Sequence, residues 1–192
     1  KKIISFFVGW IFGFGYFISN IYWITNSLTF DVKFKFIIPF ALILIPLFLG
    51  IFYGLVTFLS SLFNLKNKLS SVLIFSIFFG GIEFLRSFIL GGFPWNLLVF
   101  SVSNNLPSLQ ILSYVGTYSL NLLSITIFLL PIIFFHKYKS SAAVIFFCFG
   151  LILVVINYSY GYFNIKNFEK KKYDKLDSVI RVVSPKVPIE RF

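Results

Sequence analysis

Methionine, cysteine, histidine and acidic side chains are absent or scarce in this sequence. Its 192 residues include no methionine, one cysteine, one histidine and 6 acidic residues, against 17 lysines and arginines. The lone Cys148 can form neither a disulfide framework nor a cysteine-based metal site, and nothing in the sequence predicts a cofactor. Because methionine is absent, we expect the sequence to be a piece of a longer chain.

Charge of either sign is also scarce, and apolar residues take its place. Charged residues make up 12% of the chain, whereas 58% is hydrophobic, 22% is aromatic and 29 residues are phenylalanine. This composition is far from that of a water-soluble domain and predicts a membrane protein. The net charge of +11 does not predict nucleic-acid binding. The basic residues form short clusters between long uncharged runs, as membrane-flanking anchors do.

Five mainly apolar runs are each long enough for a membrane-spanning helix, which needs about 20 residues. Backbone groups in lipid must be satisfied internally, and the alternation of a β-barrel is missing, so the runs predict helices. We therefore expect an all-α membrane protein, a polytopic bundle of about five transmembrane helices within residues 1–165. The runs are Ile3 to Leu28, Phe36 to Phe63, Ser70 to Leu90, Ser108 to Phe135, and Ser141 to Tyr162.

The distribution of lysines between the runs predicts the orientation of the bundle. One side collects the larger group, and the positive-inside rule makes that side cytoplasmic. The C-terminal tail then points outward. The larger group is Lys1, Lys2, Lys66, Lys68, Lys137 and Lys139, and the opposite side has Lys33 and Lys35, offset by Asp31.

Small residues four apart predict close helix packing in lipid. The pairs are Gly9 with Gly13, Gly15 with Ser19, and Gly50 with Gly54.

The composition changes after the fifth run. Residues 166–178 are charge-dense and are typical of a linker at the membrane surface. The β-branched run from Val179 to Val183 is typical of a first buried strand, which we expect to open an α/β domain over residues 179–192.

The segment from Glu83 to Leu98, EFLRSFILGGFPWNLL, places two charges inside an apolar run. Glu83 and Arg86 are three residues apart and can pair on one helix face. That face should lie against other helices or a water-filled cavity, because charges in lipid are costly. The alternative is an interfacial anchor pair, in which Arg86 extends to the lipid headgroups. The sequence leaves both interpretations open.

The same segment then breaks the helix. Gly91, Gly92 and Pro94 disfavour its continuation, and Trp95 is suited to a membrane interface. Residues 96–107 are too short to cross the membrane twice, so we expect a loop or a shallow re-entrant segment at the outer surface.

EFLRSFILGGFPWNLL closely resembles a motif in the membrane part of bacterial apolipoprotein N-acyltransferases. Three further stretches resemble that family in the same order: GFGYFISNIYWITNSL at residues 13–28, YVGTYSLNLL at 114–123, and IRVVSPKVPIERF at 180–192. The resemblance covers essentially the whole chain.

The resemblance implies a multi-pass enzyme of the bacterial inner (cytoplasmic) membrane. Its extracytoplasmic nitrilase-like domain carries a catalytic Glu, Lys and Cys, all expected beyond Phe192, so this chain has no catalytic residue. An acyl chain would pass from a phospholipid, through a Cys thioester, to the N-terminal amine of a diacylglyceryl-cysteine lipoprotein. Cys148 is expected only to pack. Glu83, Arg86, Pro94 and Trp95 are expected to border or support the substrate entrance.

Two other functions remain open from the residues alone. An intramembrane Glu and Arg can line the pathway of a transporter or channel subunit. A non-catalytic membrane scaffold would also fit.

Overall fold

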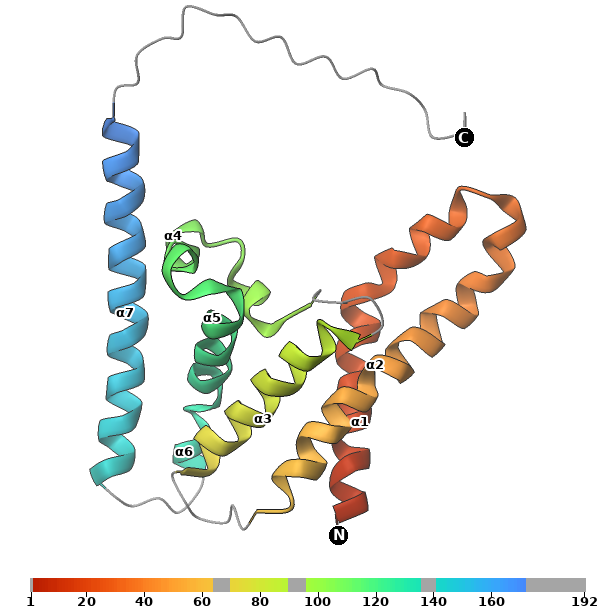
Figure 1. Cartoon of the computed structure of the whole chain (residues 1–192), viewed down its shortest axis with the longest axis horizontal. Helices are drawn as coiled ribbons and strands as arrows, with labels where there is room; N and C mark the ends of the chain where they lie inside the picture. Colours follow the sequence, from red (N-terminus) through yellow and green to blue (C-terminus); the bar gives the residue numbers. More distant parts are fainter. Residues whose placement is uncertain (1, 64–69, 90–95, 136–140, 172–192) are drawn as a thin grey trace, which may run out of the picture.

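The computed structural model describes residues 2–63, 70–89, 96–135 and 141–171, and all regular elements in these ranges are helices (Figure 1). The expected strand at residues 179–192 and most of the expected linker lie outside the described residues. In chain order, with η for a 3₁₀-helix, the elements are α1 (Lys2–Ile21), η1 (Tyr22–Thr29), η2 (Val32–Ile37), α2 (Ile38–Ser60), α3 (Ser70–Arg86), η4 (Leu98–Val102), α4 (Leu106–Leu109), α5 (Leu112–Leu129), α6 (Ile132–Phe135) and α7 (Ser141–Lys170).

Four helical stretches in the described part are long and apolar enough to cross a membrane, which confirms a helical membrane protein. They are Lys2–Thr29, Val32–Ser60, Leu112–Leu129 and Ser141–Lys170. The run expected to span from Ser70 to Leu90 forms α3, which ends at Arg86 and has 17 residues. This length is at the lower limit of the range of about 17 to 25 residues for a spanning helix.

The long helices alternate in direction (Figure 1). α1, α3 and α7 run from the end that holds the N-terminus toward the opposite end, and α2 and α5 run back. The turn between η1 and η2 and the C-terminal end of α7 therefore lie at one end of the bundle. The segment from Asn96 to Asn105, which leads into α4, lies on that side of α3 and α5, nearer the middle of the view. The predicted loop after the helix break is thus on the same side as the C-terminal end of α7.

α1 and α2 form a tightly packed hairpin because glycines line their contact. A Cβ atom on Gly13 would lie 2.9 Å from the Cα of Gly50, and a Cβ atom on Gly50 would lie 2.9 Å from the carbonyl oxygen of Trp10. The Trp10 indole donates a hydrogen bond to the Leu47 carbonyl at 2.8 Å. The backbones can approach this closely only where side chains are missing, as is typical of helices in lipid.

The three predicted small-residue pairs have different outcomes. Gly9 and Gly54 also have no room for a Cβ atom between α1 and α2, which confirms the Gly9–Gly13 and Gly50–Gly54 pairs. The Gly15–Ser19 pair does not pack against another of the described helices. Gly15 has open space around it, and the Ser19 hydroxyl donates back to its own helix at the Gly15 carbonyl, 2.9 Å away.

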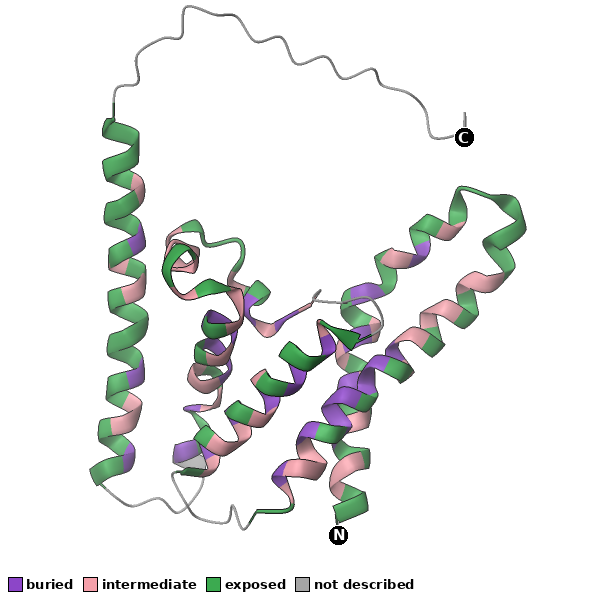
Figure 2. Cartoon of the chain, in the orientation of Figure 1, coloured by how far each residue is buried: buried purple, intermediate pink, exposed green. Residues whose placement is uncertain are grey.

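The main core lies where α1, α2 and α3 cross, and Figure 2 shows most of the buried residues there. Phe17 and Val56 are completely buried, and Tyr53 is 1% exposed. The Tyr53 ring lies 4.7 Å from the ring of Phe79 and 5.1 Å from that of Phe17, measured between centroids. Tyr53 therefore sits at the centre of contacts from three helices.

The run from Ser108 to Phe135, expected as one span, is divided into α4, α5 and α6. Within α5, Gly116 has a non-helical backbone with φ 75° and ψ 166°, a conformation that glycine adopts without strain. Pro131 follows α5 and cannot donate the next helical hydrogen bond. Pro131 explains why α5 ends at Leu129, and Gly116 kinks the helix inside Leu112–Leu129.

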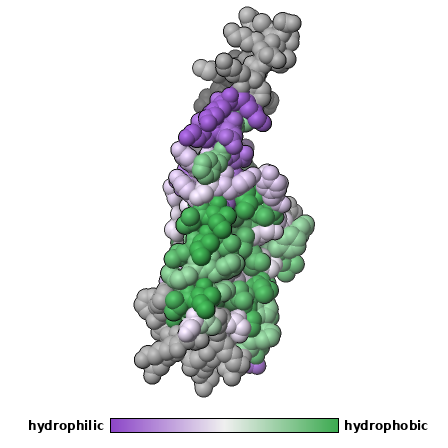
Figure 3. All heavy atoms as spheres, turned by 90° about the vertical axis from the view of Figure 1, so that its left-hand side faces the viewer, coloured by the Kyte–Doolittle hydropathy of each residue, from purple (hydrophilic) through white to green (hydrophobic). Residues whose placement is uncertain are grey.

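α7 stands beside the bundle with most of its surface exposed (Figure 2). Seen from that side, an apolar belt gives way to hydrophilic residues at the C-terminal end (Figure 3). The helix continues through Lys170, so residues 166–170 of the expected linker are helical. Cys148 is exposed on α7, and the expectation that it packs against other residues is wrong.

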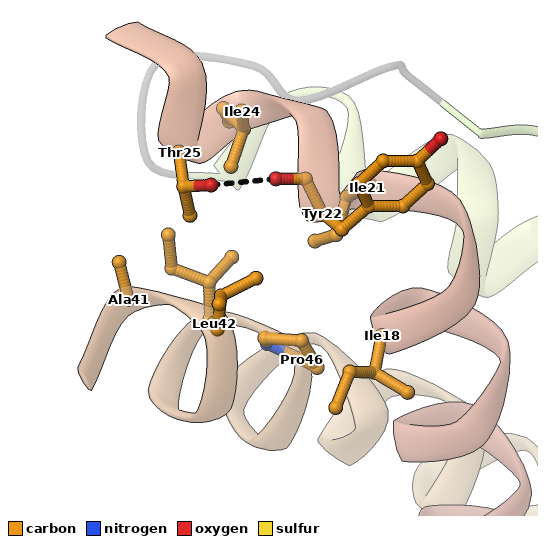
Figure 4. A pocket seen from close by; sticks show the side chains of 9 residues that line it. Ile18, Ile21, Tyr22, Ile24, Thr25, Ala41, Leu42 and Pro46 are labelled. Atoms are coloured by element: carbon orange, nitrogen blue, oxygen red, sulfur yellow. Dashed lines mark hydrogen bonds between the residues drawn. The ribbon is translucent and has the colours of Figure 1, made fainter. Parts of the chain in front are cut away.

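A shallow depression lies where η1 leaves α1 and approaches α2 (Figure 4). Ile18, Leu42 and Pro46 fill much of the space. The Thr25 hydroxyl donates to the Tyr22 carbonyl at 2.8 Å, so it offers no unused donor to a ligand. The remaining space does not admit a water molecule. This depression is part of the packing and not a ligand site.

Candidate functional site

Glu83 and Arg86 lie inside the bundle near the end of α3. Their side chains are 0% and 1% exposed, and Arg86 Nη2 lies 3.8 Å from Glu83 Oε1. The predicted pairing on one helix face is confirmed. An Arg86 that reached lipid headgroups would be exposed at its tip, so the interfacial-anchor interpretation is wrong.

The Glu83 carboxylate accepts hydrogen bonds from two other helices. Tyr53 of α2 donates its hydroxyl to Oε1 at 3.0 Å. Asn121 of α5 donates its side-chain amide to Oε2 through a short hydrogen bond. Both donors are buried, at 1% and 0% exposed. One carboxylate thus connects α2, α3 and α5, and we call Tyr53, Glu83, Arg86 and Asn121 the polar centre.

Arg86 extends the polar centre to α1. Its guanidinium carbon lies 5.1 Å from the centre of the Phe17 ring, within the range of a cation–π contact. Such contacts strengthen when water is excluded, and both side chains are almost completely buried. The centre therefore touches four helices that are far apart in sequence.

The polar centre also holds the segment that follows the predicted helix break. The Oδ1 of Asn121 accepts a hydrogen bond from the backbone N–H of Val99 at 2.9 Å. At the start of this segment, the Tyr16 hydroxyl donates to the Asn96 carbonyl at 3.0 Å. We call residues 96–102 the surface segment. It is fastened to α1 at one point and to α5 at another.

Apolar packing supports the same attachment. Leu97 and Val99 are each 1% exposed and pack with Leu120 of α5. Asn96 has a positive φ of 57°, a conformation that asparagine tolerates better than most residues. The predicted loop is thus a folded segment against the bundle. Pro94 and Trp95, the other two predicted site residues, lie outside the described residues.

A cavity of about 420 Å³ lies next to the polar centre. Tyr53 forms part of its wall, together with almost entirely apolar residues from α1, α2, α3 and α5. Its volume falls within the range of about 300 to 1,000 Å³ that is typical of ligand pockets. We call it the Tyr53 cavity.

The sequence interpretation missed Tyr53, Asn121 and Phe17. Asn121 had a usable signal, because a polar amide in an apolar run usually finds a partner inside a membrane bundle. Tyr53 had a weaker signal, since its neighbour Gly54 marks a helix contact. Phe17 had none, because it is one of 29 phenylalanines.

The polar centre is suited to holding groups in place. Among its residues, the carboxylate accepts bonds from Tyr53 and Asn121 and pairs with Arg86, and both polar ends of the Asn121 amide are used. Cys148, a potential nucleophile, is on the exposed surface of α7 and not in this cluster. The geometry therefore indicates positioning of the surface segment and of the helix ends around it.

The comparisons with known proteins agree with this membrane architecture. Residues 1–130 match the family model for the apolipoprotein N-acyltransferase N-terminal domain. The chain is 28% identical over 97% of its length to the apolipoprotein N-acyltransferase of Rhizobium rhizogenes. It is 34% identical over 65% of its length to that of Brucella melitensis, and 32% identical over 94% to that of Rickettsia bellii.

The alignments also show how much of the relatives this chain represents. They cover 34% of the Rhizobium protein, 23% of the Brucella protein and 35% of the Rickettsia protein. The chain thus spans about a third or less of these relatives and corresponds to their N-terminal part. With a family match over residues 1–130 of 192, the chain belongs to the apolipoprotein N-acyltransferase family.

Proposed function

We propose that this chain is the membrane part of an enzyme that transfers an acyl chain from a phospholipid to the N-terminal amine of diacylglyceryl-cysteine lipoproteins. The family match carries the proposal. The fold supports it, because the polar centre fastens the surface segment on the side of α3 and α5 that faces the C-terminal end of α7. A catalytic domain that follows α7 would lie over that end.

The reaction would proceed through a cysteine thioester in a nitrilase-like domain beyond Phe192. A base there would form the thiolate, and a cation would stabilise the oxyanion, so that one difficult transfer becomes two easier ones. No chemical step is assigned to Tyr53, Glu83, Arg86 or Asn121. Their proposed role is to hold the platform on which the substrates meet.

Both proposed substrates carry acyl chains, so the membrane part must admit them from the side. The apolar lining of the Tyr53 cavity is suited to an acyl chain, and the cavity borders the polar centre. We extend the proposed entrance to Pro94 and Trp95, which follow α3 in the sequence. Glu83 and Arg86 would support this entrance from below.

The proposed location is the bacterial inner membrane, with the C-terminal tail extracytoplasmic. The lysine clusters support it by the positive-inside rule. The described helix ends agree with the required alternation, because the start of α1, the end of α2 and the start of α7 lie at one end (Figure 1).

The test uses the full-length protein in proteoliposomes, with a phospholipid labelled in its acyl chain and a diacylglyceryl-cysteine lipopeptide. The expected result is a labelled N-acyl lipopeptide and a labelled protein thioester. Cys148→Ser protein should retain both, because this thiol lies on α7 in the membrane part and not in the proposed catalytic domain. No labelled product from the full-length protein would contradict the proposal and leave a scaffold or transport role. Loss of the thioester in Cys148→Ser protein would overturn the assignment of the nucleophile.

The entrance role has its own test in the same assay. Trp95→Ala should slow thioester formation when the phospholipid is limiting. Unchanged rates of both thioester formation and lipopeptide acylation would remove Trp95 from the entrance.

A further inference from the structure

A second cavity of about 290 Å³ lies between α5 and α7. α7 contacts the rest of the bundle on either side of it along the helix. Toward the C-terminal end, the Asn164 amide donates to the Gln110 side chain at 3.0 Å. Toward the other end, Gly150 packs against Leu130. We call the space between these contacts the α5–α7 cavity.

The wall of the α5–α7 cavity is mainly apolar and is accessible from the lipid side. Leu123 and Phe128 of α5 and Val154 of α7 line it, and they are 40%, 47% and 41% exposed. A membrane lipid can therefore reach the cavity by lateral diffusion. The volume is just below the range for ligand pockets, about 300 to 1,000 Å³, and favours one acyl chain over two.

Asn157 gives the cavity an oriented amide oxygen as a hydrogen-bond acceptor, in a lining that also includes Ser108 and Ser124. Its Nδ2 donates to the Ser108 carbonyl at 3.0 Å, which fixes the orientation of the amide. Its Oδ1 is buried and accepts no hydrogen bond from the described residues. Buried acceptors of this kind are normally satisfied, so this oxygen indicates a ligand or solvent group that donates a hydrogen bond.

The lining also determines which donor fits. None of the residues that line the α5–α7 cavity is charged. An ammonium group would be buried here without a carboxylate and would lose its hydration, whereas a hydroxyl is neutral and needs only the one acceptor. Leu153 lies one helical turn from Asn157, so a chain attached near the hydroxyl would continue along the apolar wall.

We propose that the α5–α7 cavity binds a single-chain glycerolipid. Its acyl chain lies between the two helices, and its free glycerol hydroxyl donates to Asn157 Oδ1. Removal of one acyl chain from a phospholipid leaves a lipid of this class with a new free hydroxyl. The link to that by-product rests on the proposed function, whereas the binding site itself rests on the cavity and Asn157.

The test is photolabelling of the full-length protein in nanodiscs with lysophosphatidylcholine that carries a diazirine in its acyl chain. The glycerol hydroxyl is the sole hydrogen-bond donor of this lipid. Labelled peptides are identified by mass spectrometry and should come from α5 and α7. Val154→Trp, which fills the cavity, should reduce this labelling about fivefold or more, and Val155→Trp should not. Val155 is a matched control because it is 63% exposed and does not line the cavity.

A competitor with the hydroxyl converted to a methyl ether tests the contact with Asn157. Unlabelled lysophosphatidylcholine should compete about fivefold better than this ether, as expected for one hydrogen bond. Equal competition would overturn the hydroxyl contact. Equal labelling of the two Trp variants, or labelling spread evenly over the exposed helix faces, would show surrounding bilayer lipid only and overturn the site.

Acyl transfer is measured separately on the same preparations. Specific labelling without any transfer would leave the lipid site intact and contradict the proposed function. Transfer without specific labelling would leave the proposed function intact and contradict the lipid site.

Discussion

Asn121 and Glu83 are 38 residues apart in the sequence, and their buried side chains meet in a short hydrogen bond between α5 and α3. The other end of the Asn121 amide accepts the Val99 N–H, so the same side chain also holds the surface segment. The position of that segment is therefore coupled to the interior of the bundle.

Asn121→Leu should loosen the surface segment while keeping a side chain of similar volume. The Val99 N–H loses its acceptor, and one net hydrogen bond corresponds to about 0.5–1.5 kcal/mol. Hydrogen exchange of residues 97–102 should then accelerate by up to about tenfold. Asn20→Leu is the control, because Asn20 is exposed and, among the described residues, its side chain donates to Tyr16 and Ser19 of the same helix. Unchanged exchange in Asn121→Leu protein would show that the attachment does not depend on this amide.

Glu83 and Arg86 should behave as a coupled pair in a double-mutant cycle with Glu83→Gln and Arg86→Gln. Removing one partner leaves a buried charge, which typically costs about 3–5 kcal/mol, whereas removing both leaves none. The coupling free energy should lie at about 0.5–3 kcal/mol, measured by denaturant unfolding in detergent. Additive single effects would contradict an ion pair.

Tyr53→Phe removes one hydroxyl from the polar centre and leaves the ring in the core. Interhelical hydrogen bonds in membranes contribute about 0.6 kcal/mol on average and up to about 1.7 kcal/mol. The free energy of unfolding should therefore decrease by an amount in this range. Tyr158→Phe is the matched control, because Tyr158 is 45% exposed on α7. A loss no greater than that of the control would mean that the bond from Tyr53 to Glu83 adds nothing to stability.

Gly13→Ala should destabilise the hairpin of α1 and α2, because the new Cβ atom would meet backbone of α2 that cannot move aside easily. Overpacking of this kind costs about 1–3 kcal/mol. Gly15→Ala, on the same helix with open space around it, should be neutral or slightly stabilising. Equal unfolding free energies for the two variants would contradict the close contact.

The sequence predicted the features that follow from a lipid environment, namely helix formation and close helix packing. Long apolar runs had to become helices in lipid, and paired glycines had to allow close contact, as Gly13 and Gly50 do. The spacing of Glu83 and Arg86 also predicted that they can pair on one helix face, as they do.

The sequence could not predict which helices meet. Tyr53 and Asn121 donate hydrogen bonds to Glu83, although they are 30 and 38 residues away from it in the sequence. A hydropathy pattern contains no information on such pairs. The kink at Gly116 and the helix end before Pro131 were also not predicted, because neither residue changes the hydropathy of the run. Cys148 was misplaced because in a membrane the exposed surface of a helix is itself apolar.

The most direct test of the account is the rate of lipopeptide N-acylation by full-length Asn121→Leu protein, compared with wild type and Asn20→Leu. If the polar centre positions the surface segment for acyl transfer, the rate should fall by about tenfold or more, since small displacements strongly affect positioned substrates. Asn20→Leu should match wild type. Equal rates in all three proteins, with the hydrogen-exchange change present, would show that the segment is held by Asn121 but plays no part in the reaction.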